Sequence, residues 1–238
     1  MQLNPQSAPH SKNNPDVNIS YLILRLAIGI IGISLPLLLV VGTLIVEGCT
    51  RLQPSISHYY YSTMHFAFLF TLSILGIFLL TYRSKNKFEN LLSNLAGLFA
   101  ICVCIFPTGY DGFKDGCGCH YLSVVMNTKP IIGYVHLGCA GLLFTCFIIF
   151  CFGIFQKSDE PGSDPTKKHR RNITYTICGW IITLSIATIG VIQIFNINFP
   201  YSTFIFETTS LLAFGFSWLL KGSLLWKNSR KMVLRYFR

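Results

Sequence analysis

Charged side chains are scarce in this sequence. Only 12% of its 238 residues are Asp, Glu, Lys or Arg, whereas an ordinary soluble domain has about a quarter. Hydrophobic residues make up 52% of the chain, and the mean hydropathy is +0.53. This composition excludes a soluble globular enzyme and favours a single domain embedded in a membrane.

The motifs of several well-known protein classes are also missing. The sequence has no Gly-rich nucleotide loop, no Gly-x-Ser-x-Gly elbow and no His-Glu-x-x-His zinc helix. It has no internal repeat that would indicate an inverted-repeat transporter. It also lacks the paired intramembrane histidines that a multi-haem electron carrier requires. The sequence therefore does not indicate any particular cofactor.

Long apolar stretches are the main feature that is present. A bilayer core about 30 Å thick needs roughly 20 apolar residues per helix at 1.5 Å per residue. Stretches of this length without strict alternation favour helices over barrel strands, because the backbone must satisfy its own hydrogen bonds in hydrocarbon. The sequence therefore predicts an all-α, polytopic membrane protein with six transmembrane helices. The predicted spans are residues 21–46, 63–82, 91–107, 131–155, 173–195 and 202–220.

The six spans form one predicted domain, residues 21–223, between two polar ends. Residues 1–20 predict a disordered tail, and the apolar stretch after them is too long for a cleavable signal peptide. Residues 224–238 predict a basic tail that lies on anionic lipid. The third span is expected to end at Pro107, because proline lacks the N–H that a helix needs.

Small residues recur within the spans where we expect helices to touch. They let two backbones approach closely, which is how helices associate in a membrane. The expected packing positions include Gly29, Gly97, Gly138, Gly141 and Gly215.

Basic residues are sorted to one side of the predicted domain. If the six helices alternate, all but three of the 19 Lys and Arg residues fall on the side of the two termini. The positive-inside rule then makes both termini cytoplasmic. The exceptions are Arg51, Lys114 and Lys129. The net charge of +10 thus needs no nucleic acid, and we expect a multi-pass protein of a bacterial inner membrane whose partners are membrane lipids. The sequence leaves open whether the protein forms a homo-oligomer.

Ionisable groups gather on the opposite, outward side. His65 lies near the start of the second span, and His136 and Glu207 lie roughly 8 Å below the ends of the fourth and sixth spans. Groups at this depth usually face the bundle interior or a wet cavity. We hypothesise that all three line a pocket covered by loops 47–61 and 108–130. The alternative is that water and headgroups satisfy them, with Glu207 paired to a basic residue.

Two outward loop segments supply further candidate ligands. The first, PSISHYYYSTMH, has three tyrosines that suit an aromatic belt, but its serines and its first histidine could also bind a phosphate. The second, GYDGFKDGCGCH, has four glycines that indicate tight turns. The candidates in these segments are Ser57, His58, Tyr60, Asp111 and His120.

Three cysteines, Cys49, Cys117 and Cys119, also lie in the outward loops. The spacing in Cys-Gly-Cys-His is one residue short of the usual zinc spacing and has no second pair, so zinc is the weakest interpretation. In an oxidising compartment, Cys117 or Cys119 could form a disulfide with Cys49. Reduced structural thiols are the alternative. The other six cysteines are expected to be small packing residues inside the spans.

Several short motifs resemble those of a family of uncharacterised bacterial membrane proteins with six spans. They are PSIS, FPT, GYVHLGCAGLLF, KKHRRNITYTICGW and ETTSLLAFGFSWLLKG, and together they cover most of residues 20–223. More distantly, the order of features is similar to the DRAM-type family, which includes proteins that act in remodelling of GPI-anchor lipids. The residues that match this order are Ser55, Ser57, His136, Glu207, Phe214 and Gly215.

The resemblance implies handling of lipids. Together with the outward groups, it leads us to expect a protein that binds a lipid or small amphiphile through an outward-facing polar pocket. One alternative is a lipid hydrolase or acyl transferase, with a histidine as general base or metal ligand and Glu207 or Asp111 as its partner. The other is a proton- or cation-coupled transporter with Glu207 as the ion site. The sequence alone does not decide whether the protein is an enzyme.

Overall fold

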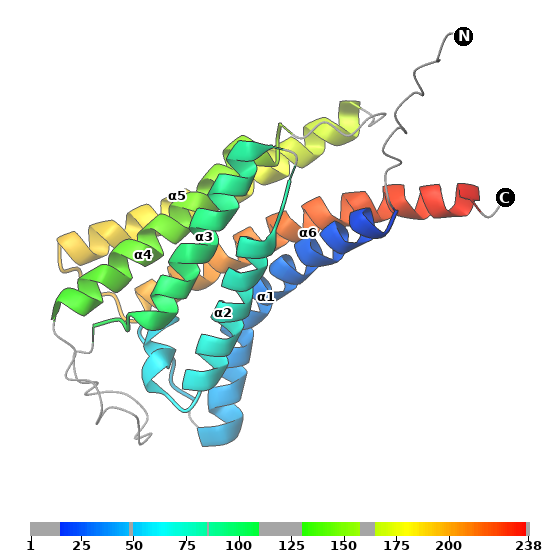
Figure 1. Ribbon diagram of the computed structural model, residues 1–238. Helices are drawn as coiled ribbons and strands as arrows, with labels where there is room; N and C mark the ends of the chain where they lie inside the picture. The colour runs from blue at the N-terminus through cyan, green and yellow to red at the C-terminus, as the bar shows by residue number, and fades with distance from the viewer. Residues whose placement is uncertain (1–14, 48–49, 85, 110–129, 158–164, 237–238) are drawn as a thin grey trace, which may run out of the picture.

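Six long helices make up most of the described chain. The computed structural model describes residues 15–47, 50–84, 86–109, 130–157 and 165–236, and these residues contain no β-strand. The prediction of an all-α fold is confirmed. The helices are α1 (Pro15–Glu47), α2 (His65–Thr81), α3 (Lys87–Ile105), α4 (Pro130–Ile149), α5 (Pro165–Ile194) and α6 (Ser202–Tyr236) (Figure 1). A 3-10 helix, η1 (Ser57–Tyr61), precedes α2, and a π-helical turn, η3 (Phe150–Ile154), continues α4.

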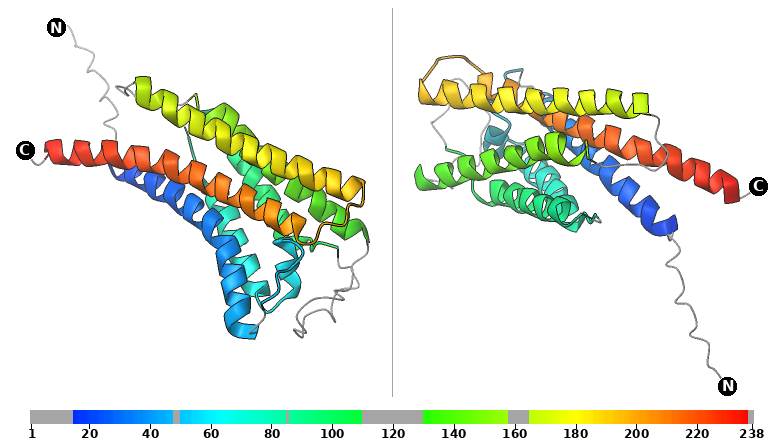
Figure 2. Two further views of the ribbon diagram at one scale, coloured as in Figure 1. Left: turned by 180° about the vertical axis from the view of Figure 1, so that it is seen from behind. Right: turned by 90° about the horizontal axis from the view of Figure 1, so that it is seen from above.

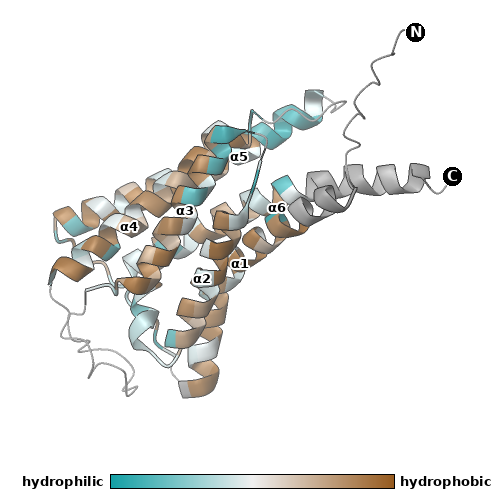
Figure 3. Ribbon diagram, viewed as in Figure 1, coloured by the Kyte–Doolittle hydropathy of each residue, from teal (hydrophilic) through white to brown (hydrophobic). Residues whose placement is uncertain are grey.

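Five of the six helices are long and apolar enough to cross a membrane. The exception is α2, whose 17 residues are also apolar but extend only about 25 Å at 1.5 Å per residue. Large apolar side chains cover the outside of the bundle; Phe66 on α2 and Leu184 on α5, for example, are 75% and 60% exposed. The middle parts of the helices are accordingly apolar in Figure 3. The structure is that of a multi-pass membrane protein with five to six spans.

The helices form a ring in which each packs against its neighbours in the chain. α6 closes this ring against α1, so that the start of α1 and the end of α6 lie at the same end of the molecule (Figure 1, Figure 2). α1 bends part of the way along its length. Pro36 lies inside it and cannot donate a helical hydrogen bond, which accounts for the bend.

Both terminal helices are longer than the predicted spans. α1 begins at Pro15, within the predicted tail of residues 1–20, and the remaining residues of that tail lie outside the described chain. α6 continues as one helix to Tyr236, through most of the predicted basic tail of residues 224–238. The third predicted span ends slightly early, at Ile105, and Phe106 is extended as expected for a residue before proline.

The described basic residues lie mainly at the end of the bundle where α1 starts and α6 ends, here called the inner end. This end also contains the connection from α2 to α3 and the start of α5, which are polar in Figure 3. Arg51 lies at the opposite end, here called the outer end. The basic residues of the inner end are Arg25, Arg83, Lys87, Lys157, Lys167, Lys168, Arg170, Arg171 and Lys221.

Aromatic rings from α4, η3 and α6 fill the centre of the bundle. Phe147 and Phe214 stack with their ring centroids 3.6 Å apart. Trp218 is fully buried and packs against Phe150, with the centroids 5.2 Å apart. These four residues, here called the aromatic layer, separate the two ends of the molecule. Ring contacts of this kind stabilise a membrane bundle through packing.

Two pairs of glycines allow the closest helix crossings. A Cβ atom on Gly29 of α1 would lie 2.8 Å from the carbonyl oxygen of Gly215 on α6, and one on Gly215 would lie 2.6 Å from that of Gly29. In the same way, a Cβ atom on Gly97 of α3 would lie 2.6 Å from the carbonyl oxygen of Gly76 on α2. The absence of a side chain at these positions is therefore required for helix packing.

Gly138 and Gly141 do not fit the packing role that the sequence suggested. Among the described residues, no heavy atom outside the adjoining backbone of α4 lies within 4 Å of a Cβ built on either of them. They lie on α4, where Gly138 is exposed. The spacing of small residues indicates which helix face they share but not what that face contacts, so the expectation of packing within the chain is wrong for these two.

Alanine substitutions should separate the two kinds of glycine. We expect Gly29→Ala and Gly215→Ala each to lower the free energy of unfolding by roughly 1–3 kcal/mol, because the added methyl overlaps a backbone oxygen. Gly138→Ala is the control, and it should leave stability unchanged or raise it by about 0.5–1 kcal/mol through helix propensity. Thermal unfolding of the protein in detergent measures the three variants. Equal shifts at all three positions would contradict the close crossing of α1 and α6.

Candidate functional site

Residues 50–64, here called the outer cap, connect α1 to α2 at the outer end. Most of the cap is buried although η1 is its only helix, and Tyr59 is just 1% exposed. The cap is attached to the start of α6, since the Phe204 N–H donates to the Pro54 carbonyl at 3.0 Å. The rings of Tyr59 and Phe204 also lie 6.2 Å apart. A loop at the membrane boundary is thus held in one conformation by the bundle.

Glu207 of α6 binds the backbone of the outer cap. Its Oε2 accepts a hydrogen bond from the Ile56 N–H at 2.7 Å, and the N–H of Ser57 is a second donor. Among the described residues, no basic side chain forms an ion pair with Glu207. Buried backbone N–H groups need an acceptor, and by supplying one Glu207 fixes the start of η1 to α6.

Ser55 and His58 form a hydrogen-bonded pair within the cap. The Ser55 Oγ lies 2.6 Å from the His58 Nδ1 and also accepts from the His58 backbone N–H at 3.2 Å. When the hydroxyl donates to Nδ1, the proton of a neutral imidazole resides on Nε2. Ser55 is 3% exposed and His58 is half-buried. The cap therefore places a serine hydroxyl against a base.

His65 closes the cap at the start of α2. Its Nδ1 lies 2.5 Å from the Tyr60 carbonyl oxygen, and the two rings meet edge to face with centroids 4.5 Å apart. Burial raises the pKa of the Tyr60 hydroxyl above its ordinary value, so this group is neutral at physiological pH. His65 and Tyr60 thus form a polar boundary between the cap and the apolar part of α2.

His136 binds the end of α3 rather than the outer cap. Its Nδ1 lies 2.6 Å from the Phe106 carbonyl oxygen, and the Val103 carbonyl is a second partner. The Tyr61 hydroxyl donates to the nearby Thr108 carbonyl at 2.6 Å. The last carbonyls of a helix lack partners within the helix. His136 is such a partner at the end of α3, and Tyr61 binds a carbonyl in the segment that follows.

The three ionisable groups singled out from the sequence therefore all bind backbone. Glu207 and His65 hold the outer cap, and His136 joins α3 to α4. In the described part of the chain, no hydrogen bond or ion pair links the three side chains to one another. Their convergence on one polar pocket stays a prediction.

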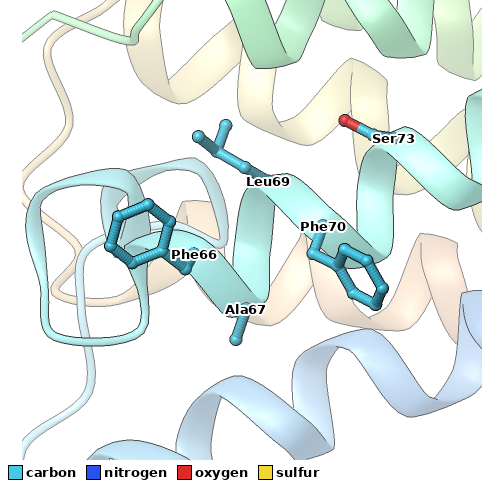
Figure 4. A pocket seen from close by; sticks show the side chains of 5 residues that line it. All are labelled: Phe66, Ala67, Leu69, Phe70 and Ser73. Carbon is cyan, nitrogen blue, oxygen red and sulfur yellow. The ribbon is translucent and has the colours of Figure 1, made fainter.

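An apolar hollow of about 560 Å³ lies on the surface of α2, directly after the outer cap. The His65 ring contacts both Tyr60 in the cap and Phe66 in the hollow, with centroids 4.5 and 5.3 Å away. The hollow thus begins where the polar cap ends, and none of the predicted ligands lines it. Its lining residues are Phe66, Ala67, Leu69, Phe70 and Ser73 (Figure 4).

Several predicted site residues lie outside the described chain, and the predicted disulfide among them stays a prediction. The described residues contain no group of three or more His, Cys, Asp or Glu side chains that could hold a metal ion. The six described cysteines are free thiols within the helices. The residues outside the description are Asp111, His120, Cys49, Cys117 and Cys119.

A second polar cluster lies at the inner end, and the sequence analysis missed it. Glu89 of α3 is 6% exposed and accepts hydrogen bonds from the Tyr82 hydroxyl at 2.6 Å and the Ser84 hydroxyl at 2.7 Å. Arg25 of α1 donates through Nε to the Tyr82 oxygen at 2.9 Å, and its Nη2 lies 3.6 Å from Glu89. These four residues are here called the inner network. A charged residue inside the first predicted span, Arg25, was the signal for it.

The inner network joins α1, the α2–α3 connection and α3, and it also reaches α6. The Tyr82 hydroxyl donates to Glu89 and accepts from Arg25, so one oxygen connects the two charged groups. The Tyr82 ring packs edge to face on Trp218, with centroids 5.3 Å apart. Nearby, Lys221 of α6 donates to the Phe155 carbonyl at 3.3 Å. All four side chains of the inner network have polar partners, and the network therefore stabilises the inner ends of the helices.

Comparisons with protein-family models, curated proteins and solved structures find no match for this chain. The function must therefore be inferred from the geometry of the outer cap, the hollow and the inner network.

Removal of one hydroxyl tests the inner network. Tyr82→Phe keeps the ring against Trp218 but removes the oxygen that Arg25 and Glu89 share, so we expect a loss of roughly 1–3 kcal/mol in the free energy of unfolding. Tyr134→Phe is the matched control, because Tyr134 on α4 is 69% exposed. Thermal unfolding in one detergent compares the two variants. An unchanged melting temperature for Tyr82→Phe would show that the network does not stabilise the fold.

Proposed function

We propose that this protein binds a lipid or a related small amphiphile at its outer end, with the polar head on the outer cap and the apolar chain in the hollow along α2. One observation carries the proposal: the hollow begins at Phe66, directly beside the His65 and Tyr60 rings that close the cap. A binding site for an amphiphile needs an apolar groove and a few polar groups placed at one end of it.

The outer cap offers suitable chemistry for a polar head. It contains the Ser55–His58 pair, the largely buried Ser57, and Arg51 close by in the chain. Hydroxyl, imidazole and guanidinium groups are hydrogen-bond donors, and guanidinium in particular suits phosphate and carboxylate. These groups favour a head that carries oxygen acceptors.

The hollow offers suitable chemistry for an apolar chain. Phe66 and Phe70 are 75% and 69% exposed on the surface of α2, so the hollow of about 560 Å³ is shallow and open along the helix. The one polar residue of the lining, Ser73, donates its hydroxyl to Cys104 of α3 at 3.5 Å. The hollow therefore presents almost only carbon to its occupant.

The proposal agrees with the resemblance to the DRAM-type family, which includes proteins that act in remodelling of GPI-anchor lipids. Of the residues that match its order of features, Ser55 and Ser57 lie in the outer cap and Glu207 binds it. Phe214 and Gly215 instead pack the bundle. Some of the matching residues thus lie at the proposed site, and others support the fold.

We also propose that the inner end faces the cytoplasm, in a bacterial inner membrane. The supporting observation is that the described basic residues gather where α1 starts and α6 ends. The positive-inside rule relates this asymmetry to orientation.

Reporter fusions after Arg238 test the orientation. We expect a fluorescent protein fused there to fluoresce, because it matures in the cytoplasm. We expect an alkaline phosphatase fused there to be inactive, because it matures only outside the cytoplasm. An active phosphatase and a dark fluorescent protein would place the inner end outside and overturn the assignment.

A lipid analogue with a photoreactive group in its acyl chain tests binding. In vesicles, we expect it to label peptides from α2 in preference to those from α5. Ala67→Trp should fill the hollow and lower α2 labelling roughly tenfold, which corresponds to about 1.4 kcal/mol of binding. Ala187→Trp, at an exposed position of α5, is the matched control and should change nothing. Even labelling around the bundle, unchanged in Ala67→Trp, would show that α2 meets only bulk lipid.

A further inference from the structure

We propose that Ser55 is an acyl-accepting nucleophile with His58 as its general base, so that the outer cap removes or transfers an acyl group from an ester-linked amphiphile. This inference rests on the proposed function, because binding of the amphiphile must bring the ester to the cap. It names a reaction for a pair of side chains that binding alone does not require.

The geometry of the pair meets the first requirement for such a reaction. The distance of 2.6 Å from Ser55 Oγ to His58 Nδ1 lies within the 2.6–3.2 Å, approximately, over which a base takes a proton from a nucleophile. The backbone keeps the pair together, since the His58 N–H donates to both the Ser55 carbonyl and the Ser55 Oγ at 3.2 Å. The pair is therefore formed before any substrate binds.

The bundle holds this turn on both sides of the serine. The residue before it is fixed by the 3.0 Å bond from Phe204 N–H to the Pro54 carbonyl, and the residue after it by the 2.7 Å bond from Ile56 N–H to Glu207. Both attachments come from α6. A site whose reacting groups are fixed to rigid elements loses less entropy in the reaction. Glu207 is accordingly a positioning residue.

The boundary between the outer cap and the hollow is where the ester of a bound amphiphile would lie. In an ester-linked amphiphile, the carbonyl joins the polar head to the apolar chain. In this protein, the cap meets the hollow at Tyr60, His65 and Phe66. An amphiphile with its chain in the hollow places its ester at this boundary, and the proposed reaction brings the ester to Ser55, which belongs to the same cap and is 3% exposed.

The reaction balances without any oxidant or reductant. The Ser55 Oγ attacks the ester carbonyl carbon, and its proton passes to His58 Nδ1. The ester C–O bond breaks, the leaving alcohol takes this proton from His58, and the acyl group stays on Ser55. Water or a second alcohol or amine then attacks the acyl carbon and loses its proton to His58, which returns it to the Ser55 Oγ as the acyl–Ser55 bond breaks.

The surroundings of the pair predict slow turnover. The N–H groups of Ile56 and Ser57, which follow the nucleophile, donate to Glu207 and so do not face a developing oxyanion. Loss of a single oxyanion donor slows comparable enzymes by about 10²–10³ in kcat. Acylation and deacylation both pass through such an oxyanion, so both steps should be slow. We therefore expect a single covalent labelling event on Ser55 to be a more sensitive measurement than repeated turnover.

A fluorophosphonate with a long alkyl chain tests the inference on the full chain in lipid nanodiscs. We expect one phosphonate per chain by intact mass, located on Ser55 by peptide mapping. Ser55→Ala should abolish the adduct, and His58→Gln should slow its formation by roughly 10²–10⁴. Thr209→Ala, at an exposed position on the outer part of α6, is the control that should label at the wild-type rate.

The photoreactive lipid is applied to the same preparations. Failure of the inference and failure of the proposed function then give different results. Adduct on Ser55 together with lipid labelling that persists in Ser55→Ala supports both. Lipid labelling of α2 without a Ser55 adduct overturns the inference and leaves binding intact, with the Ser55–His58 bond acting only as a turn cap. Absence of both overturns both. Wild-type peptide mapping and His58→Gln keep the test decisive if Ser55→Ala does not fold.

Discussion

The structure depends on one constraint, that backbone groups which leave a helix at the membrane boundary must find partners. Hydrocarbon supplies none, and an unpaired buried group costs several kcal/mol. Side chains supply these partners at the outer end. Glu207 of α6 accepts from the cap N–H groups, while His136 of α4 and Tyr61 of the cap bind carbonyls that follow α3. The fixed shape of the cap, and with it the Ser55–His58 pair, follows from these bonds.

The same constraint explains what the sequence could and could not indicate about the ionisable residues of the outer end. Apolar length was enough to predict the helices, and depth below a helix end was enough to select His65, His136 and Glu207. Depth does not reveal the partner, however. Each of the three binds a backbone group that the one-dimensional pattern treats as featureless. The Ser55–His58 pair was visible as a motif, but its hydrogen bond depends on the 3-10 turn, which no periodicity in so short a segment indicates.

The inner network was missed for a different reason. Arg25 was counted as one more cytoplasmic charge, and Glu89 stood among basic residues where an exposed ion pair is the ordinary expectation. Only the ring order of the helices brings α1 beside the α2–α3 connection and buries both groups around Tyr82. The glycines show the same limit: Gly29 and Gly215 pack, whereas Gly138 does not, although all three look alike in the sequence.

The aromatic layer bears on which function the outer end can have. α6 carries Glu207 toward the outer end and Lys221 at the inner end, and between them the Phe147 and Phe214 rings stack at 3.6 Å while Trp218 is fully buried. A proton or cation taken up at Glu207 would have to pass these rings, with uncharged hydroxyls such as those of Ser210 and Ser217 buried on the same helix. Glu207 itself is engaged by the cap backbone. This arrangement disfavours conduction through the bundle. It suits chemistry confined to the outer end, where the cap, the hollow and the Ser55–His58 pair share one boundary with the lipid.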